Sequence, residues 1–264
     1  NADITLSNTG NAFASAVTLS TTGSTAHATI DNGTTTLDIA ASSVGGDLTL
    51  ISGNASGITD SGNVTVGGNL AATTNANHGV INMGTLEVDG TVALTTNGNG
   101  AATAVNDVGL IFAASTVGGA LSATATTGNI TQGSGNLAIT GAATFITVAG
   151  GSNIILDGSG NAFAAAVTLR AGDGTDEAFG NITFVDSAAV KLHTSAGTDG
   201  DLFIDGHPDR AVGGNLSITA RAGDITQGAA VAVTGTSSFT TLTNNRTITL
   251  SNTGNAFASA VTLS

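Results

Sequence analysis

The chain has 264 residues, of which 41% are apolar, and a formal net charge of −13 that comes from five basic and eighteen acidic side chains. This apolar fraction, with abundant Val, Ile and Thr, excludes a disordered chain and favours strands. The sparse, acidic charge argues against nucleic acid or an anionic membrane as a direct partner. No apolar run reaches the roughly 18–20 residues of a membrane span, so membrane insertion is not expected.

Short stretches in which apolar residues alternate with polar ones follow one another along the chain. In the first part they are Ile4-x-Leu6, Val17-x-Leu19, Leu37-x-Ile39, Leu48-x-Leu50 and Val64-x-Val66. Later strand centres are predicted near Ile154, Val167, Ile182, Val190, Leu202, Leu216, Ile225, Val231 and Phe239. Period-two alternation bounded by Gly, Asn and Asp predicts short, half-buried strands. No segment keeps the apolar spacing of a helix, so almost no α-helix is expected.

Whole phrases of the sequence recur. Residues 4–20 and 248–264 both read ITLSNTGNAFASAVTLS, and diverged copies open at Ile154 and Ile81. A second phrase recurs once in each repeat, in phase with the first. Its three copies are AASSVGGDL, AASTVGGAL and AVGGNL, which end at Leu48, Leu121 and Leu216. We therefore expect one continuous fold, built of the repeats 4–80, 81–153 and 154–247 and the start of a further repeat at 248–264.

Short strands, Gly-rich connections and repeated phrases are typical of a parallel β-helix, in which each coil stacks on the one before it. The predicted fold is all-β, with roughly ten to twelve coils. Each repeat supplies about three coils if three strands make one coil, and four if a coil holds fewer residues. Recurrence and alternation predict which side chains point inward, namely Ile4, Leu6, Val17, Leu19, Ile154, Leu156, Val167, Leu169, Ile248 and Leu250.

Three kinds of residue recur at fixed places in the phrases and are predicted to be structural. Asn11, Asn161 and Asn255 are expected to tie down a corner or to stack in a ladder along the axis. Phe13, Phe163 and Phe257 are expected to fill the core or a corner. The paired glycines are expected to supply positive φ at a corner, and they are Gly118, Gly119, Gly213 and Gly214.

Charge gathers in residues 170–210. This segment holds eight of the eighteen acidic residues, which are Asp173, Asp176, Glu177, Asp186, Asp199, Asp201, Asp205 and Asp209. We expect it to project as solvated loops. Calcium binding at Asp199 and Asp201, in the turn GTDGD, is a weaker alternative, because oxygen-rich turns suit a hard cation. Catalysis with His207 and Arg210 as partners is a third reading, but the chain has no Trp or Tyr to stack on sugar rings, so no enzyme and no cofactor are expected.

The other histidines, His27 and His78, stand alone in Thr- and Asn-rich phrases and are predicted to be exposed. No metal role is expected for them.

The phrases ITLSNTGNAFASAVTLS and VGGNLSITARAGDITQGAAVAVTGTSSF resemble the strand repeats of very large bacterial surface proteins related to filamentous haemagglutinin and other two-partner-secreted adhesins. The resemblance covers the whole chain. It implies a long right-handed β-helix, secreted to the bacterial cell surface, that serves as a filament, sheath or adhesin stalk. The implied partners are adjacent repeats or copies of the chain joined end to end, and glycans on a host, prey or neighbouring cell.

This segment lacks the amino-terminal secretion domain of such proteins, so we expect the export signal to lie outside it. Both ends carry an ordinary phrase without charged or proline-rich protection, and from this we expect an interior part of a longer filament. The alternative that stays open is a β-helix that binds or cleaves carbohydrate.

Overall fold

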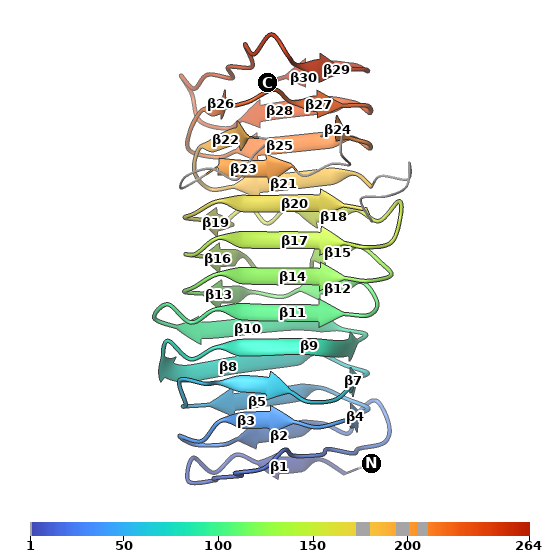
Figure 1. Cartoon of the computed structure of the whole chain (residues 1–264), viewed down its shortest axis with the longest axis vertical. Coiled ribbons are helices and arrows are strands. Elements are labelled where there is room, and N and C mark those ends of the chain that lie inside the picture. Colours follow the sequence, from blue (N-terminus) through green and yellow to red (C-terminus); the bar gives the residue numbers. More distant parts are fainter. Residues whose placement is uncertain (1, 173–179, 194–200, 205–210) are drawn as a thin grey trace.

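The structure is a computed structural model that describes residues 2–172, 180–193, 201–204 and 211–264, and its strands stack as a parallel β-helix (Figure 1). The predicted all-β class is confirmed, since every element of these residues is a strand. Twelve strands of the first sheet succeed one another along the axis, so about eleven turns separate the first from the last. This count lies within the predicted ten to twelve coils. Within the same residues, no helix has the length and apolar character to cross a membrane.

The first sheet takes one strand from each turn. In axial order these strands are β1 (Ile4–Leu6), β2 (Ala28–Asp31), β5 (Leu48–Ser52), β8 (Leu70–Asn77), β10 (Thr91–Asn97), β12 (Leu110–Phe112), β15 (Ile130–Gln132), β18 (Ile154–Leu156), β21 (Ile182–Asp186), β25 (Leu216–Ala220), β28 (Ser237–Thr241) and β30 (Val261–Leu263). Their register places like residues in columns, so that Ile130 pairs with Ile154 and Ile154 with Ile182. Alternation therefore sends the same column inward at every turn.

The second sheet faces the first across the core. Its main strands are β3 (Leu37–Ile39), β6 (Ile58–Asp60), β9 (Ile81–Val88), β11 (Ala102–Asn106), β14 (Leu121–Ala125), β17 (Ala143–Thr147), β20 (Val167–Ala171), β23 (Asp201–Ile204), β22 (Val190–His193) and β26 (Ile225–Gln227). Strand β23 lies between β20 and β22, out of chain order. The prediction that 170–210 projects as loops is therefore wrong for β21, β22 and β23, because these strands pair within the two sheets.

Shorter strands line the two edges where the chain passes between the sheets. They are β4 (Ser42–Val44), β7 (Val64–Val66), β13 (Ser115–Val117), β16 (Leu137–Ile139), β19 (Ala162–Phe163), β24 (Ala211–Val212), β27 (Ala232–Val233) and β29 (Ala256–Phe257). Figure 1 shows β4 and β7 on the right edge, β13, β16 and β19 on the left edge, and β24, β27 and β29 on the right again. Thus the edge that carries the short strands changes sides along the rod.

The core is a narrow column of aliphatic side chains with a run of phenylalanines inside it. The predicted inward residues Leu19, Ile154, Leu156, Val167 and Leu169 are buried. The others pack against the core and are half-buried, namely Ile4, Leu6, Val17, Ile248 and Leu250. They belong to the two end turns, where a neighbouring turn covers only one side.

Successive repeats are turned about the axis by half a turn, which the sequence did not predict. Ile4 and Ile154 open strands of the first sheet, whereas Ile81 opens a strand of the second sheet and Ile248 pairs with Ile225 of the second sheet. Counting strands between these points shows that each repeat spans about three and a half turns. Equivalent positions therefore appear alternately on the two sheets, which explains why the short strands change edges.

Candidate functional site

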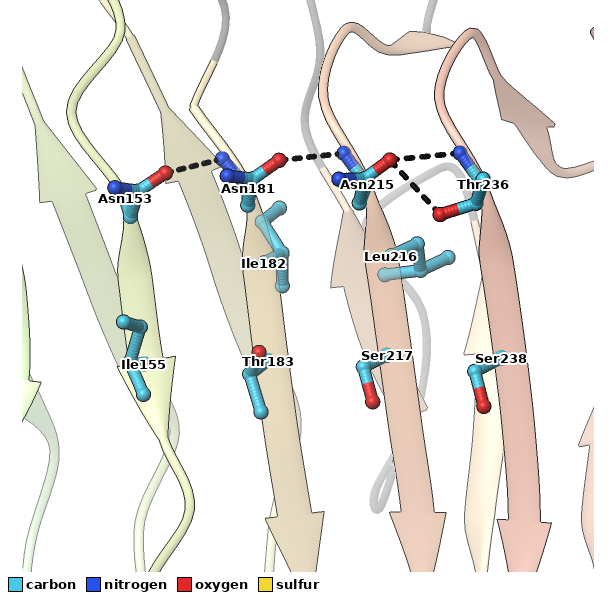
Figure 2. Close-up of a pocket in the computed structure, with 10 residues that line it drawn as sticks. All are labelled: Asn153, Ile155, Asn181, Ile182, Thr183, Asn215, Leu216, Ser217, Thr236 and Ser238. Carbon is cyan, nitrogen blue, oxygen red and sulfur yellow. Dashed lines mark hydrogen bonds between the residues drawn. The ribbon is translucent and has the colours of Figure 1, made fainter. Parts of the chain in front are cut away.

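A ladder of polar side chains runs along one edge of the first sheet, at the residue that precedes each strand (Figure 2). The Oδ1 of Asn129 accepts the backbone N–H of Asn153 at 2.7 Å, and Asn153 accepts that of Asn181 at 2.7 Å. Asn181 then accepts the N–H of Asn215, and Asn215 that of Thr236, both at 2.8 Å. These rungs are 24, 28, 34 and 21 residues apart, so each one ties a turn to the next whatever the length of the turn.

The same edge carries a ladder in the first repeat, built from other side chains. Asp3 accepts the N–H of His27, whose Nδ1 accepts the N–H of Asp47, both at 2.9 Å. Asp47 accepts the N–H of Asn69 at 2.7 Å, and Asn69 that of Thr91 at 2.9 Å. His27 is thus half-buried within a ladder rather than isolated, and its Nδ1 also lies 3.3 Å from Oδ2 of Asp47.

His78 also joins two turns, at a neighbouring corner. Its side chain is exposed, as predicted, but its Nδ1 accepts the backbone N–H of Asn99 at 3.0 Å. The residue itself adopts a φ of 64°. In both histidines the ring nitrogen takes the place that an amide or carboxylate oxygen has elsewhere, so each ring joins two turns.

A hollow of about 330 Å³ opens beside the asparagine ladder, over β18, β21, β25 and β28. Its lining contains no charged residue and consists of Asn153, Ile155, Asn181, Ile182, Thr183, Asn215, Leu216, Ser217, Thr236 and Ser238. Figure 2 shows Thr183, Ser217 and Ser238 in one row across adjacent strands, parallel to the ladder. The surface therefore offers a row of hydroxyls next to a row of amides, with strand spacing between the members of each row.

The corner asparagines Asn11, Asn161 and Asn255 do not stack on one another, because the turns that contain them are not adjacent. Asn161 is fully buried, and its Oδ1 accepts the N–H of Leu137 at 2.9 Å. Asn255 does the same for Val231 at 3.0 Å, and each amide also pairs with a glutamine of the preceding turn. Asn11 donates to the carbonyl of Leu6 at 2.9 Å. Asn161 and Asn255 thus tie their corners to the preceding turn, and the ladder of the first sheet is made by other residues.

The phenylalanines of the same phrase differ in burial. Phe163 is buried and lies in an aromatic column with Phe112, Phe145 and Phe184. Phe257 is half-buried, and its ring centroid lies 6.0 Å from that of Phe239. Phe13 is half-buried and packs against the core in the first turn. The position faces the core in each copy.

The paired glycines do not have the conformation that the sequence predicts. None of Gly118, Gly119, Gly213 and Gly214 has a positive φ, so that prediction is wrong. Close approach of successive turns explains the glycine instead. A Cβ on Gly118 would lie 1.7 Å from the carbonyl oxygen of Gly98, and one on Gly214 would lie 2.4 Å from that of Gly180.

Calcium binding at Asp199 and Asp201 stays a prediction. Asp199 lies outside the described residues, and so do His207 and Arg210; Asp201 opens β23, and its side chain is outside what the structure describes. Among the residues that are described, no group of three or more His, Asp or Glu side chains could hold a metal ion.

One acidic residue of the segment 170–210 is buried, although the sequence predicts that it is solvated. Asp186 ends β21 with its side chain only 5% exposed, where the charge pattern predicts a solvated loop. Burial raises the pKa of its carboxyl group above the ordinary value of 3.8, although backbone hydrogen bonds from Ala188, Phe163 and Ser187 oppose the shift.

Comparison with known proteins places the chain among repeat sequences. A family model described as repeats of unknown function (DUF5649) matches residues 25–82, 99–170 and 179–264, which together make up most of the chain. No curated protein and no solved structure matches it.

Proposed function

We propose, because the chain belongs to this family of repeats, that it is a structural module that gives length and stiffness to a bacterial cell-surface filament, sheath or adhesin stalk. The observation that carries the proposal is the continuity of the stack. One core and one pair of sheets run through about eleven turns, and the same phrase serves in the first and the last of them. In such a solenoid every added turn extends the rod by the strand spacing of about 4.8 Å.

Two further features support the proposal that the module is stiff. The side-chain ladders join adjacent turns at one edge, in addition to the backbone bonds of the sheets. The half-turn between repeats alternates the edge that carries the short strands, so an asymmetry of one repeat is offset by the next. The resemblance to haemagglutinin-type repeats supports the cell surface as the location, and adhesion to a neighbouring cell as a further role.

Imaging of the organism that makes the chain tests this proposal. Antibodies against the folded 264 residues, carrying gold particles, should decorate fibres or a sheath on intact cells when viewed by electron microscopy. Cells that lack the gene provide the control. Label that appears only after the cells are broken open would contradict the proposal.

A second candidate function, the binding of a neutral carbohydrate, is favoured by the hollow over β18, β21, β25 and β28. Amides and hydroxyls each donate and accept hydrogen bonds, as sugar hydroxyls do, and both rows lie at the surface without a charged residue between them. Calorimetry with neutral oligosaccharides should detect binding that Ser217→Phe abolishes by filling the hollow. The matched change Ser122→Phe, at the equivalent place on the second sheet, should leave binding unaltered. Equal loss in both variants, or no binding at all, would exclude this function.

A further inference from the structure

One buried position recurs in all three repeats, at the end of the related phrases ATIDN, ATAVN and ITFVD. It is occupied by Asn32, Asn106 and Asp186, which are 0%, 0% and 5% exposed. The phrases belong to β2, β11 and β21, that is, to the first, second and first sheet in turn. This order follows the half-turn between repeats, so the three side chains occupy one structural place.

The two asparagines close the corner in the same way, by pairing with the backbone N–H and the carbonyl of one residue in the preceding turn. Oδ1 of Asn32 accepts the N–H of Phe13 at 2.7 Å, while its Nδ2 donates to the carbonyl of Phe13 at 3.1 Å. Asn106 repeats this with Val88, at 2.8 and 3.1 Å. Each Nδ2 also donates forward into its own corner, to Thr36 and to Gly109. The place therefore requires a donor and an acceptor on one side chain.

Asp186 meets the same partner but lacks the donor when it is ionised. Its carboxyl group accepts from the backbone of Phe163, the counterpart of Phe13, and from the N–H of Ala188 at 3.3 Å. It also accepts from the backbone and the side chain of Ser187. An ionised carboxylate has only acceptors, whereas a protonated one has an O–H donor beside a carbonyl oxygen, which is the pattern of an amide. Protonation thus lets Asp186 reproduce the pairing of the two asparagines.

Among the residues that the structure describes, no charged side chain is a cause of the shift in the pKa of Asp186. Of the elements around it, β18 is followed by the exposed Asp157, and β19 contributes Phe163 and the adjoining Asn161, which are uncharged. Arg221 follows β25 and reaches Asp186 with its backbone N–H, which donates to the main-chain carbonyl at 2.9 Å. Burial is the largest cause of the raised pKa.

We propose that Asp186 is a pH-sensitive latch, which closes the corner after β21 when it is protonated and loosens the following turn when it ionises. The described part of that turn that directly follows the corner runs to His193 and contains β22. Because the folded-state pKa is raised, the stabilisation is fully present below the ordinary carboxyl pKa and is lost as pH rises through the folded-state value. The corner after β21 is therefore tighter in acid, whereas the corners that Asn32 and Asn106 close contain an amide that does not titrate.

Urea unfolding of three variants across about pH 4 to about pH 8 tests the latch. Asp186→Asn should remove the part of the pH dependence that Asp186 contributes and be more stable than the parent chain at neutral pH. Within the titration range, the ratio of the two unfolding constants should change by up to about tenfold per pH unit. Asp157→Asn, which alters an exposed carboxylate one turn away, should follow the parent chain at every pH.

The reverse transplant separates a latch from a general effect of charge. Asn106→Asp should give the second repeat the same loss of stability as pH rises. Hydrogen exchange should localise the two openings, to 187–193 in the parent chain and to 107–120 in the transplant. Parallel pH profiles for Asp186→Asn and the parent chain, failure of Asp186→Asn to fold, or a pH-insensitive Asn106→Asp would each overturn the proposal.

Discussion

Replacing Phe145 with Ala is expected to lower the free energy of unfolding by about 3–5 kcal/mol. Phe145 is fully buried, and its ring meets those of Phe112 and Phe163 edge-on, at centroid distances of 5.9 and 6.1 Å. Removal of the ring would open a cavity between two turns. The turns cannot close over it, because sheet hydrogen bonds fix their spacing on both sides of the core. Urea denaturation followed by circular dichroism would measure the loss.

The neighbouring residue on the same strand provides the matched control. Ile146 points outward and is half-buried, so Ile146→Ala removes an apolar side chain without opening a core cavity. We expect it to cost less than about 1 kcal/mol. If both variants lose a similar amount of unfolding free energy, the aromatic column does not make the large contribution to core stability that we expect.

The class of the fold could be predicted because two local signals agree along the whole chain. Apolar alternation at residues such as Leu37 and Ile39 predicts a strand with one buried face, and both side chains are fully buried. Recurrence of the phrase that starts at Ile4 and Ile154 predicts stacked coils, and both residues open strands of the first sheet. Neither signal depends on the path that the chain takes between strands.

The half-turn between repeats could not be predicted, since it depends on the lengths of the turns. Ladder residues that occupy the same place lie between 20 and 34 residues apart, so no fixed period in the sequence shows which sheet a phrase will join. The two sheets accept the same phrase because both need only alternating apolar residues. For that reason Ile81 lies on the sheet opposite to Ile4, although both open the same element.

The ladder residues and Asp186 were missed for different reasons. Asn153 and Asn181 are each followed by Ile at the start of a strand, a recurrence that the sequence shows, but the three-dimensional register is needed to show that they are neighbours. The acidic character of residues 170–210 predicts a solvated position for Asp186. Its alignment with Asn32 and Asn106, in the phrases ATIDN, ATAVN and ITFVD, was a signal in the sequence that could have identified it as a corner residue.

Gly118 stacks directly on the backbone of Gly98, and the second large expected effect is therefore a loss of about 3 kcal/mol in the free energy of unfolding for Gly118→Ala. A Cβ on Gly118 would lie 1.7 Å from the carbonyl oxygen of Gly98, an atom of the backbone that no side-chain rotation can move away. The corner would have to open, which weakens the hydrogen bond from the N–H of Gly118 to Oγ1 of Thr96 at 3.0 Å. The bond from Gly119 to Gly100, at 2.8 Å, would weaken with it.

Gly133→Ala is the control that separates this close approach from the general cost of replacing a glycine. A Cβ on Gly133 would find its nearest neighbours at 3.5 Å, which is an ordinary contact, and its φ is not positive. We therefore expect a change within about 0.5 kcal/mol, measured by urea denaturation beside Gly118→Ala. If both variants are equally stable, glycine at the corner is not needed for close stacking. If only Gly118→Ala fails, the narrow spacing of the corners limits which residues the repeat tolerates there, as it also does at Gly45, where a Cβ would lie 2.6 Å from the carbonyl oxygen of Gly23.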